Sequence, residues 1–284
     1  MNYLLIAAAA ILFSFQFLFN QSFQRENGAA FKDSLTFSIY AAAGVFVIML
    51  VLNRFRIACN LFTVCVALVY AAVCILCSYA SFKAISVVNL SKFSIYMMLG
   101  GMLLPAVYGI VCFGESMGAG KLVCGLLIIA ALFFTYEKGR NSPKEIFYFA
   151  AVFIMNGTVG VISKFHQSNE AMRVDSFSFM AVTSAVRLII CLIIYLILER
   201  KLPKVNGKSL LYTGEYALCN GIGNLFLLIA LTTLPASVQY PMITGGTIVC
   251  SAAVEAIRGE KVRMKTVLAV VIALAASVMM GFFA

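Results

Sequence analysis

The sequence contains few charged side chains for its length. Its 284 residues include 11 acidic and 21 basic ones, a single histidine and no tryptophan, whereas 63% are apolar or aromatic. A soluble domain of this size needs many more polar side chains to cover its surface. This shortage excludes soluble globular folds, disordered chains and small secreted domains held by disulfide bonds.

Groups that would bind a metal or a nucleotide are also scarce. The nine cysteines lie mostly in apolar runs without neighbouring histidines or carboxylates, which is typical of small buried side chains and not of a disulfide framework. Cys74 and Cys77 form one CxxC pair, but a zinc site needs a second pair of ligands. Gly221-Ile222-Gly223 lacks the strand and the acidic partner of a nucleotide-binding fold. The sequence therefore predicts no cofactor, no metal and no ATP-driven pump.

Long apolar runs make up most of the chain. A helix that crosses a hydrocarbon core of about 30 Å needs about 20 residues, so ten such helices would use about 200 residues. Helices are favoured over barrel strands because the runs are long and do not alternate. The sequence predicts an all-α integral membrane protein with ten transmembrane helices, at residues 2–23, 33–52, 59–82, 92–113, 118–136, 145–167, 176–198, 209–231, 238–257 and 264–283.

The basic residues are distributed unevenly over the joints between these helices. Fifteen lysines and arginines lie in or next to the odd-numbered joints, and five lie on the other side. By the positive-inside rule, the odd-numbered joints face the cytoplasm and both termini face outward. The net charge of +10 is thus a topology signal and not a sign of nucleic-acid binding. We expect a multi-pass protein of the cell membrane, typical of a bacterial inner membrane.

The two halves of the chain repeat each other. At an offset of 145 residues, glycine pairs, a Gly-Glu pair and an alanine pair recur at matching places in the predicted helices. Because each half has five helices, an odd number, the second copy enters the membrane upside down. We expect two inverted five-helix repeats, residues 1–139 and 140–284, an arrangement that favours transport by alternating access. The matched residues are Met97 and Met242, Gly100 and Gly245, Gly101 and Gly246, Gly114 and Gly259, Glu115 and Glu260, Ala130 and Ala275, and Ala131 and Ala276.

These features resemble the drug/metabolite transporter (DMT) superfamily and its EamA-like ten-helix transporters. The resemblance rests on ten helices in two halves, on the Gly-Glu pair after the fourth helix of each half, and on a fifth helix that begins Gly125-x-x-Ile128. It implies a carrier with a central cavity lined by the first, third, fourth, sixth, eighth and ninth helices. The chain departs from the family in having no tryptophan in its first helix, where Gln16 lies, and in its outward-facing termini.

Arg187 lies near the middle of the seventh predicted helix, eleven residues from its start. A charged side chain at this depth is costly in lipid and is a functional candidate for that reason. One interpretation is that its guanidinium holds a carboxylate or phosphate of a substrate by paired hydrogen bonds. The alternative is a structural ion pair with Glu215 or Glu255.

The ninth predicted helix carries a stripe of polar residues. Spacings of three and four residues keep the stripe on one face of the helix, so it is a candidate cavity wall, although tight packing through small residues is the alternative. Glu255, at the end of the stripe, and Glu215 on the eighth helix are candidates for a coupling proton. The stripe consists of Tyr240, Thr244, Thr247, Ser251 and Glu255.

Further polar side chains recur on other predicted helices, mostly at helical spacing. Amides in the middle of an apolar helix donate and accept hydrogen bonds, so they suit zwitterionic or polyhydroxylated solutes. The alternative is that they tie neighbouring helices together. The remaining candidate substrate-binding residues are Gln16, Asn20, Tyr70, Ser78, Tyr96, Asn156, Asn220 and Asn224.

These patterns favour a secondary-active transporter of a small polar metabolite, such as an amino acid or a related anion or zwitterion. The alternative is an exporter or flippase for an amphiphilic, multidrug-type or lipid-linked compound. An enzyme is disfavoured, because no cluster of His, Asp and Glu lies at one depth in the predicted helices. The expected partners are a small-molecule substrate, the lipid bilayer and a coupling proton, and the expected state is a monomer or a weak dimer.

Overall fold

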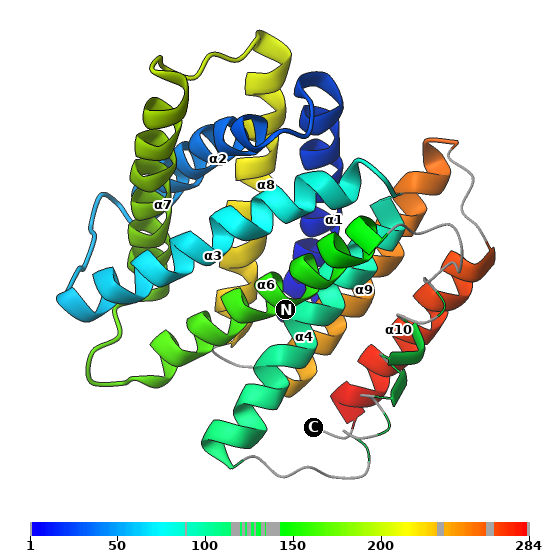
Figure 1. Cartoon of the computed structure of the whole chain (residues 1–284). Helices are drawn as coiled ribbons and strands as arrows, with labels where there is room; N and C mark the ends of the chain where they lie inside the picture. The colour runs from blue at the N-terminus through cyan, green and yellow to red at the C-terminus, as the bar shows by residue number, and fades with distance from the viewer. Residues whose placement is uncertain are drawn as a thin grey trace.

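Every regular element that the structure describes is an α-helix (Figure 1). The computed structural model describes residues 2–88, 90–114, 143–231, 236–259 and 264–282, and the helical positions 120, 123, 126, 127, 129–131 and 134. The predicted fifth helix, residues 118–136, otherwise lies outside the described residues. The helices are α1 (Asn2–Asn27), α2 (Phe31–Leu52), α3 (Leu61–Ile85), α4 (Leu90–Phe113), α6 (Pro143–Ser168), α7 (Ser176–Glu199), α8 (Gly207–Leu231), α9 (Ala236–Ile257) and α10 (Met264–Phe282).

Most of the predicted membrane helices are confirmed as helices, with ends within a few residues of the predicted ones. Within the described residues, α1, α2, α3, α4, α6 and α7 are long and apolar enough to cross a bilayer. α9 and α10 contain shorter apolar stretches, Met242–Ile257 and Met264–Ala276. α8 is 25 residues long and carries Glu215, Asn220 and Asn224, which makes it one of the more polar helices of the bundle.

Short polar side chains and glycines mark the helix ends. Asn60 caps α3, where its Oδ1 accepts a hydrogen bond of 2.8 Å from the Thr63 N–H, and Asp175 caps α7 by accepting from the Ser178 N–H at 3.0 Å. Gly114 and Gly259 follow α4 and α9 with φ angles of 63° and 74°. A left-handed backbone at a helix end favours glycine, which has no Cβ to clash. These two glycines are 145 residues apart, the offset of the sequence repeat.

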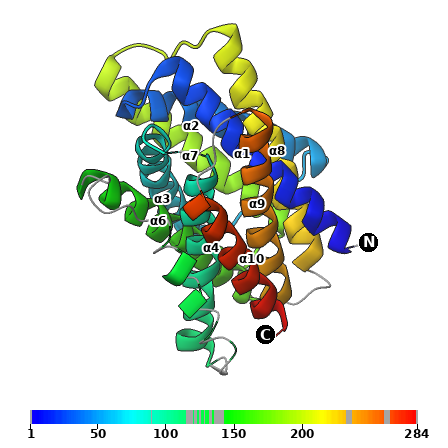
Figure 2. The same cartoon turned by 90° about the vertical axis from the view of Figure 1, so that its right-hand side faces the viewer.

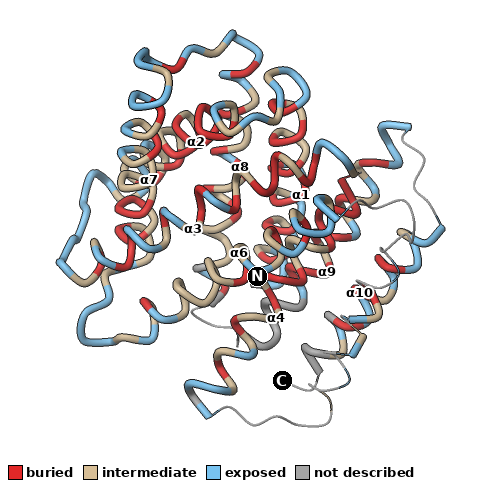
Figure 3. The backbone as a smooth tube through the Cα atoms, in the orientation of Figure 1, coloured by how far each residue is buried: buried red, intermediate tan, exposed pale blue. Residues whose placement is uncertain are grey.

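Helices from the first half of the chain pack mainly against helices from the second half. α1 packs against α8 and α9, α2 against α7 and α8, α3 against α6 and α7, and α4 against α6 and α9. Figure 2 shows α10 on the outside of the bundle, where it covers α9. Buried residues gather where the helices face one another, and exposed ones line the outer faces (Figure 3). This interleaving surrounds the centre of the molecule with residues from both halves.

Glycines allow several of these helices to approach closely. A Cβ on Gly100 of α4 would lie 2.1 Å from the backbone oxygen of Phe153 on α6, so no larger residue fits there. On α9, a Cβ on Gly246 would lie 2.9 Å from the Ala10 side chain on α1. Small residues at helix contacts are the usual means of close packing in membranes. Gly100 and Gly246, one from each glycine pair, therefore lie at α4–α6 and α9–α1, contacts that correspond under the predicted repeat.

Candidate functional site

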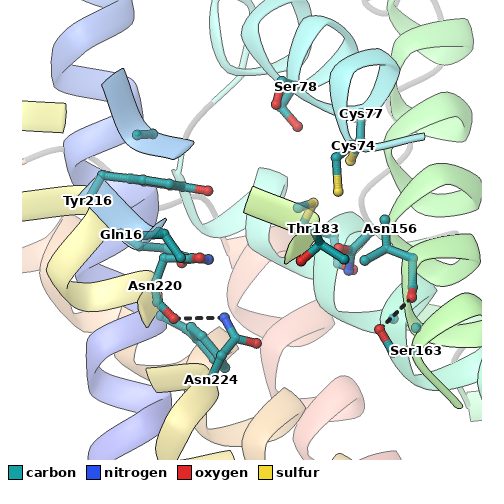
Figure 4. A pocket seen from close by; sticks show the side chains of 18 of the residues that line it. Gln16, Cys74, Cys77, Ser78, Asn156, Ser163, Thr183, Tyr216, Asn220 and Asn224 are labelled. Atoms are coloured by element: carbon teal, nitrogen blue, oxygen red, sulfur yellow. Dashed lines mark hydrogen bonds between the residues drawn. The ribbon is translucent and has the colours of Figure 1, made fainter. Parts of the chain in front are cut away.

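A cavity of about 270 Å³ lies at the centre of the bundle (Figure 4). Its walls come from α1, α2, α3, α4, α6, α7, α8 and α9, so it is built by helices from both halves. The cavity brings together nine residues that the sequence nominated: Gln16, Asn20, Tyr70, Ser78, Asn156, Arg187, Asn220, Asn224 and Thr244. Helices α2 and α7 also line it, in addition to those that the family resemblance implied.

Arg187 is held in the cavity wall by neutral groups. Its Nη2 donates hydrogen bonds to Ser38 Oγ of α2 at 2.9 Å and to Ser78 Oγ of α3 at 2.7 Å. Its Nε is buried and has no hydrogen-bond partner. Among the described residues that line the cavity, Arg187 is the only charged one. The wall therefore presents one positive charge, with no carboxylate beside it to balance it.

The ion pair considered as the alternative for Arg187 is not found among the described residues. Glu255 contacts Ser91 at the start of α4 and does not line the cavity. Glu215 lies half-buried on α8, also outside the cavity lining. The packing of the helices separates these carboxylates from Arg187. The depth of each residue along its own helix could not reveal this separation.

The amides form much of the facing wall. Asn220 Nδ2 donates to Gln16 Oε1 at 2.8 Å, which links α8 to α1, and Asn224 Nδ2 donates to the Asn220 backbone oxygen at 2.7 Å. Asn20 Oδ1 is buried without a hydrogen-bond partner. Figure 4 shows Gln16, Asn220 and Asn224 together on one side of the cavity. These amides both tie α1 to α8 and present polar atoms to the cavity.

The opposite side is formed by α6 and α7. Asn156 Nδ2 donates to the Met97 backbone oxygen at 2.6 Å, and Asn156 lies with Ser163 and Thr183 across the cavity from the α1–α8 amides (Figure 4). Tyr70 of α3 packs edge-on against Phe179 of α7, with ring centroids 5.8 Å apart. The cavity thus has polar groups on two facing walls.

Some lining residues were not nominated from the sequence. Tyr216 lines the cavity one turn before Asn220 and two turns before Asn224, so the same spacing argument would have identified it. Ser38, which contacts Arg187, lies four residues after Ser34 on α2, so the same spacing argument would have identified it too. An apolar part of the lining lacks a sequence signal, since these residues resemble any other core residues. It includes Phe13, Phe17, Phe93, Met97 and Met98.

Other nominated residues lie away from the cavity lining. Tyr96 stacks on Phe149 in the contact between α4 and α6, with ring centroids 4.8 Å apart. Thr247, Ser251 and Glu255 are buried farther along α9. Tyr240 belongs to α9, but its side chain lies outside the described residues. The described residues contain no group of three or more His, Cys, Asp or Glu that could hold a metal ion.

An all-helical bundle with apolar helices of membrane-spanning length is the architecture of a multi-pass membrane protein. The EamA-like transporter family, which belongs to the drug/metabolite transporter superfamily, matches residues 143–282 of the chain. The predicted resemblance is confirmed. The family match indicates a membrane transporter of the drug/metabolite type.

The match to solved structures extends the likeness to the whole chain. One crystal structure, described only as "Crystal structure of protein", is similar with a TM-score of 0.62 and 16% sequence identity, over 99% of this chain and 96% of that one. At this identity the likeness concerns the fold alone. No curated protein matches the chain.

Proposed function

We propose that the protein is a secondary-active transporter of a small polar anion or zwitterion, such as an amino acid or a related metabolite. The observation that carries this proposal is Arg187, whose charge faces the central cavity with serine hydroxyls as its hydrogen-bond partners. A buried ion without a counter-charge is costly. A carboxylate or phosphate in the cavity would supply that counter-charge and accept hydrogen bonds from the remaining N–H groups of the guanidinium.

The polar atoms on the walls limit what else the solute carries. Asn20 Oδ1 is an acceptor without a partner, and the amides of Asn220 and Asn224 retain hydrogen-bonding capacity. These groups suit a hydroxyl, amide or ammonium group on the same solute. A solute with an acid at one end and a hydrogen-bond donor at the other therefore fits the cavity best.

The mechanism that we propose is alternating access of two inverted halves, residues 1–139 and 140–284. Helix packing supports this idea, because adding five to each label, and subtracting ten from any sum above ten, turns several of the larger contacts into other contacts. The contact α1–α8 corresponds to α6–α3, α1–α9 to α6–α4, and α2–α8 to α7–α3, while α2–α7 and α4–α9 correspond to themselves. Such symmetry is what inverted repeats require for two equivalent packings of the same halves.

A second candidate is transport of an amphiphile, and the apolar part of the lining favours it. Phe13, Phe17, Phe93, Met97 and Met98 line the cavity, and methionine-rich surfaces adapt to ligands of different shape. Arg187 would then select anionic amphiphiles over cationic ones. The two candidates differ in the tail of the solute and share the acid group.

Exchange in proteoliposomes tests the proposal. Vesicles loaded with one member of an acid and amide pair, such as glutamate and its diamide or octanoate and octanamide, are supplied with the same compound in radiolabelled form. We expect exchange of acids over amides in the unchanged protein, and its loss in Arg187→Gln. Lys201→Gln, at an exposed lysine that pairs with Glu199 at 3.6 Å, is the matched control. Exchange that favours amides, or that survives Arg187→Gln, would overturn the anion role.

A further inference from the structure

The cavity wall carries two stripes of polar residues with the same pattern, one on α3 and one on α8. Both helices are 25 residues long, and each stripe occupies the tenth, fourteenth and eighteenth residues of its helix. These two helices are the third helices of the two predicted repeats. A tyrosine begins each stripe, so each half of the chain brings one tyrosine to the cavity. The stripes consist of Tyr70, Cys74 and Ser78 on α3 and of Tyr216, Asn220 and Asn224 on α8, and all six residues line the cavity.

The two tyrosine hydroxyls converge on Arg187. Each of them is close enough to the guanidinium to interact with it, and Tyr70 interacts with Tyr216 as well. The Tyr216 ring packs edge-on against Phe37 of α2, with ring centroids 4.7 Å apart, and Figure 4 shows its hydroxyl pointing into the cavity. The Tyr70 ring is held in the same way by Phe179. Three polar groups from α3, α7 and α8 therefore meet at one place in the cavity wall.

Each of these hydroxyls has a hydrogen left to donate. Tyr216 lies within hydrogen-bonding reach of Arg187, and because a guanidinium only donates, the Tyr216 oxygen acts as the acceptor there. Tyr70 lies within reach of the Cys74 thiol, whose sulfur is a weak acceptor. Within the part of the chain that the structure describes, neither hydroxyl donates to a protein oxygen or nitrogen. The site therefore presents two hydroxyl donors beside one cation.

The charge of this site, unlike the tyrosines, comes from one half of the chain only. Arg187 lies on α7, and at the repeat offset of 145 residues the corresponding position is Ala42 on α2. Ala41 and Ala42 both line the cavity, so the first half presents methyl groups where the second half presents a guanidinium. A single cation attracts a single acid group, and one tyrosine from each half lies beside it.

We propose that Tyr70 and Tyr216 are specificity-determining residues that bind the acid group of the solute together with Arg187, each donating its hydroxyl hydrogen to an oxygen of that group. This inference rests on the proposed function and names the residues that select the acid. A carboxylate or phosphate accepts hydrogen bonds at every terminal oxygen. An amide of the same shape has an NH₂ group in place of one oxygen, so a donor of the site would face another donor. A site built to bond an acceptor rejects an analogue that lacks it, because a polar group of the site is then left unpaired.

Binding of octanoate and octanamide to the whole protein in lipid nanodiscs tests the proposal, because these two probes share the same tail. Tyr70→Phe and Tyr216→Phe should each weaken octanoate binding by about tenfold, since each removes a hydrogen bond to a charged group, and should change octanamide binding little. Tyr40→Phe is the matched control, because its hydroxyl donates to the Pro203 backbone oxygen at 2.9 Å and does not line the cavity. Octanoate affinities that are equal in all three variants and in the unchanged protein would overturn the proposal.

Fluorine magnetic resonance tests whether the hydroxyls contact the acid. Protein labelled with 3-fluorotyrosine carries one fluorine on each of its 12 tyrosines, and the three Tyr→Phe variants assign the resonances of Tyr70, Tyr216 and Tyr40. Octanoate should shift the first two resonances and leave that of Tyr40 in place, and Arg187→Gln should abolish both shifts. A shift of neither resonance, or of one alone, would overturn the role of the pair.

These measurements separate a failure of this inference from a failure of the proposed function. Phenylalanine keeps the tyrosine ring and its contact with Phe37 or Phe179, so both variants should melt in lipid at nearly the same temperature as the unchanged protein. Octanoate binding that is lost in Arg187→Gln but unchanged in both tyrosine variants would overturn this inference and leave the anion carrier intact. A lack of any acid binding or exchange in the unchanged protein would instead contradict the proposed function, and this inference with it.

Discussion

Arg187 and Glu255 are both ionisable side chains on apolar helices, but the structure holds them in opposite ways. Arg187 faces the central cavity and is bonded to two serine hydroxyls of other helices. Glu255 is sealed away from the cavity and is bonded to the N-terminus of α4. The first charge lines the cavity, whereas the second lies outside the cavity lining and contacts Ser91 of α4. The difference shows that the surroundings of an ionisable side chain, and not only its place on an apolar helix, decide whether it faces the cavity.

The largest effect is expected for Arg187, the charge that lines the cavity. Arg187→Gln should weaken binding of an anionic solute by about 2–5 kcal/mol, roughly thirtyfold or more in Kd, because a buried charge pair loses one partner. Arg187→Lys should retain part of the affinity, since an ammonium keeps the charge but not the forked geometry. Calorimetry with glutamate or octanoate measures these changes, and an unchanged Kd in Arg187→Gln would remove the contrast with Glu255.

The next effect concerns the serines that orient Arg187. Ser78→Ala should weaken anion binding by about 1.5 kcal/mol, roughly tenfold, because it removes a hydrogen bond to a charged group. Ser34→Ala is the control, since its hydroxyl is bonded to the Phe31 backbone oxygen of its own helix. If both variants bind the anion equally well, the serines do not position the guanidinium.

A smaller effect is expected on a native thiol near Arg187. Cys74 lines the cavity beside Ser78, so a sulfonated thiol reagent should modify it faster than a quaternary ammonium reagent of the same size (Figure 4). The rate ratio should be about fivefold, from roughly 1 kcal/mol of attraction between unit charges in a watery site. Mass spectrometry of the Cys74 peptide gives the rates. The ratio should approach unity in Arg187→Gln, and a ratio that survives there would place the positive field elsewhere.

The smallest effect is expected on the stability of the contact between Glu255 and Ser91. Ser91→Ala removes one donor to Glu255 and keeps the backbone N–H, so it should lower the free energy of unfolding by about 1 kcal/mol. Ser86→Ala, at an exposed serine bonded to the Lys83 backbone oxygen, should have less effect. Thermal unfolding in lipid compares the two. Equal melting temperatures would show that the contact of α9 with α4 does not depend on this serine.

Periodicity predicted faces of helices but not what those faces contact. The spacing of Thr244, Thr247, Ser251 and Glu255 correctly places them on one face of α9. The structure brings only Thr244 to the cavity and buries the others, because α9 extends beyond the cavity along its contacts with α1 and α4. Tyr96 is a similar case, since its ring turns to Phe149 of α6. These outcomes depend on how helices cross, which spacing within one helix does not contain.

The apolar runs and the approximate helix ends were determined by the sequence alone, and the repeat at 145 residues stays a prediction from it. Each membrane helix satisfies its backbone hydrogen bonds within itself, so its existence depends on local composition. The tertiary structure decided that Arg187 meets Ser38 and Ser78, while Glu255 meets Ser91. Those partners lie more than a hundred residues apart in the chain, and only the packing of α2, α3, α4, α7 and α9 brings them within hydrogen-bonding distance.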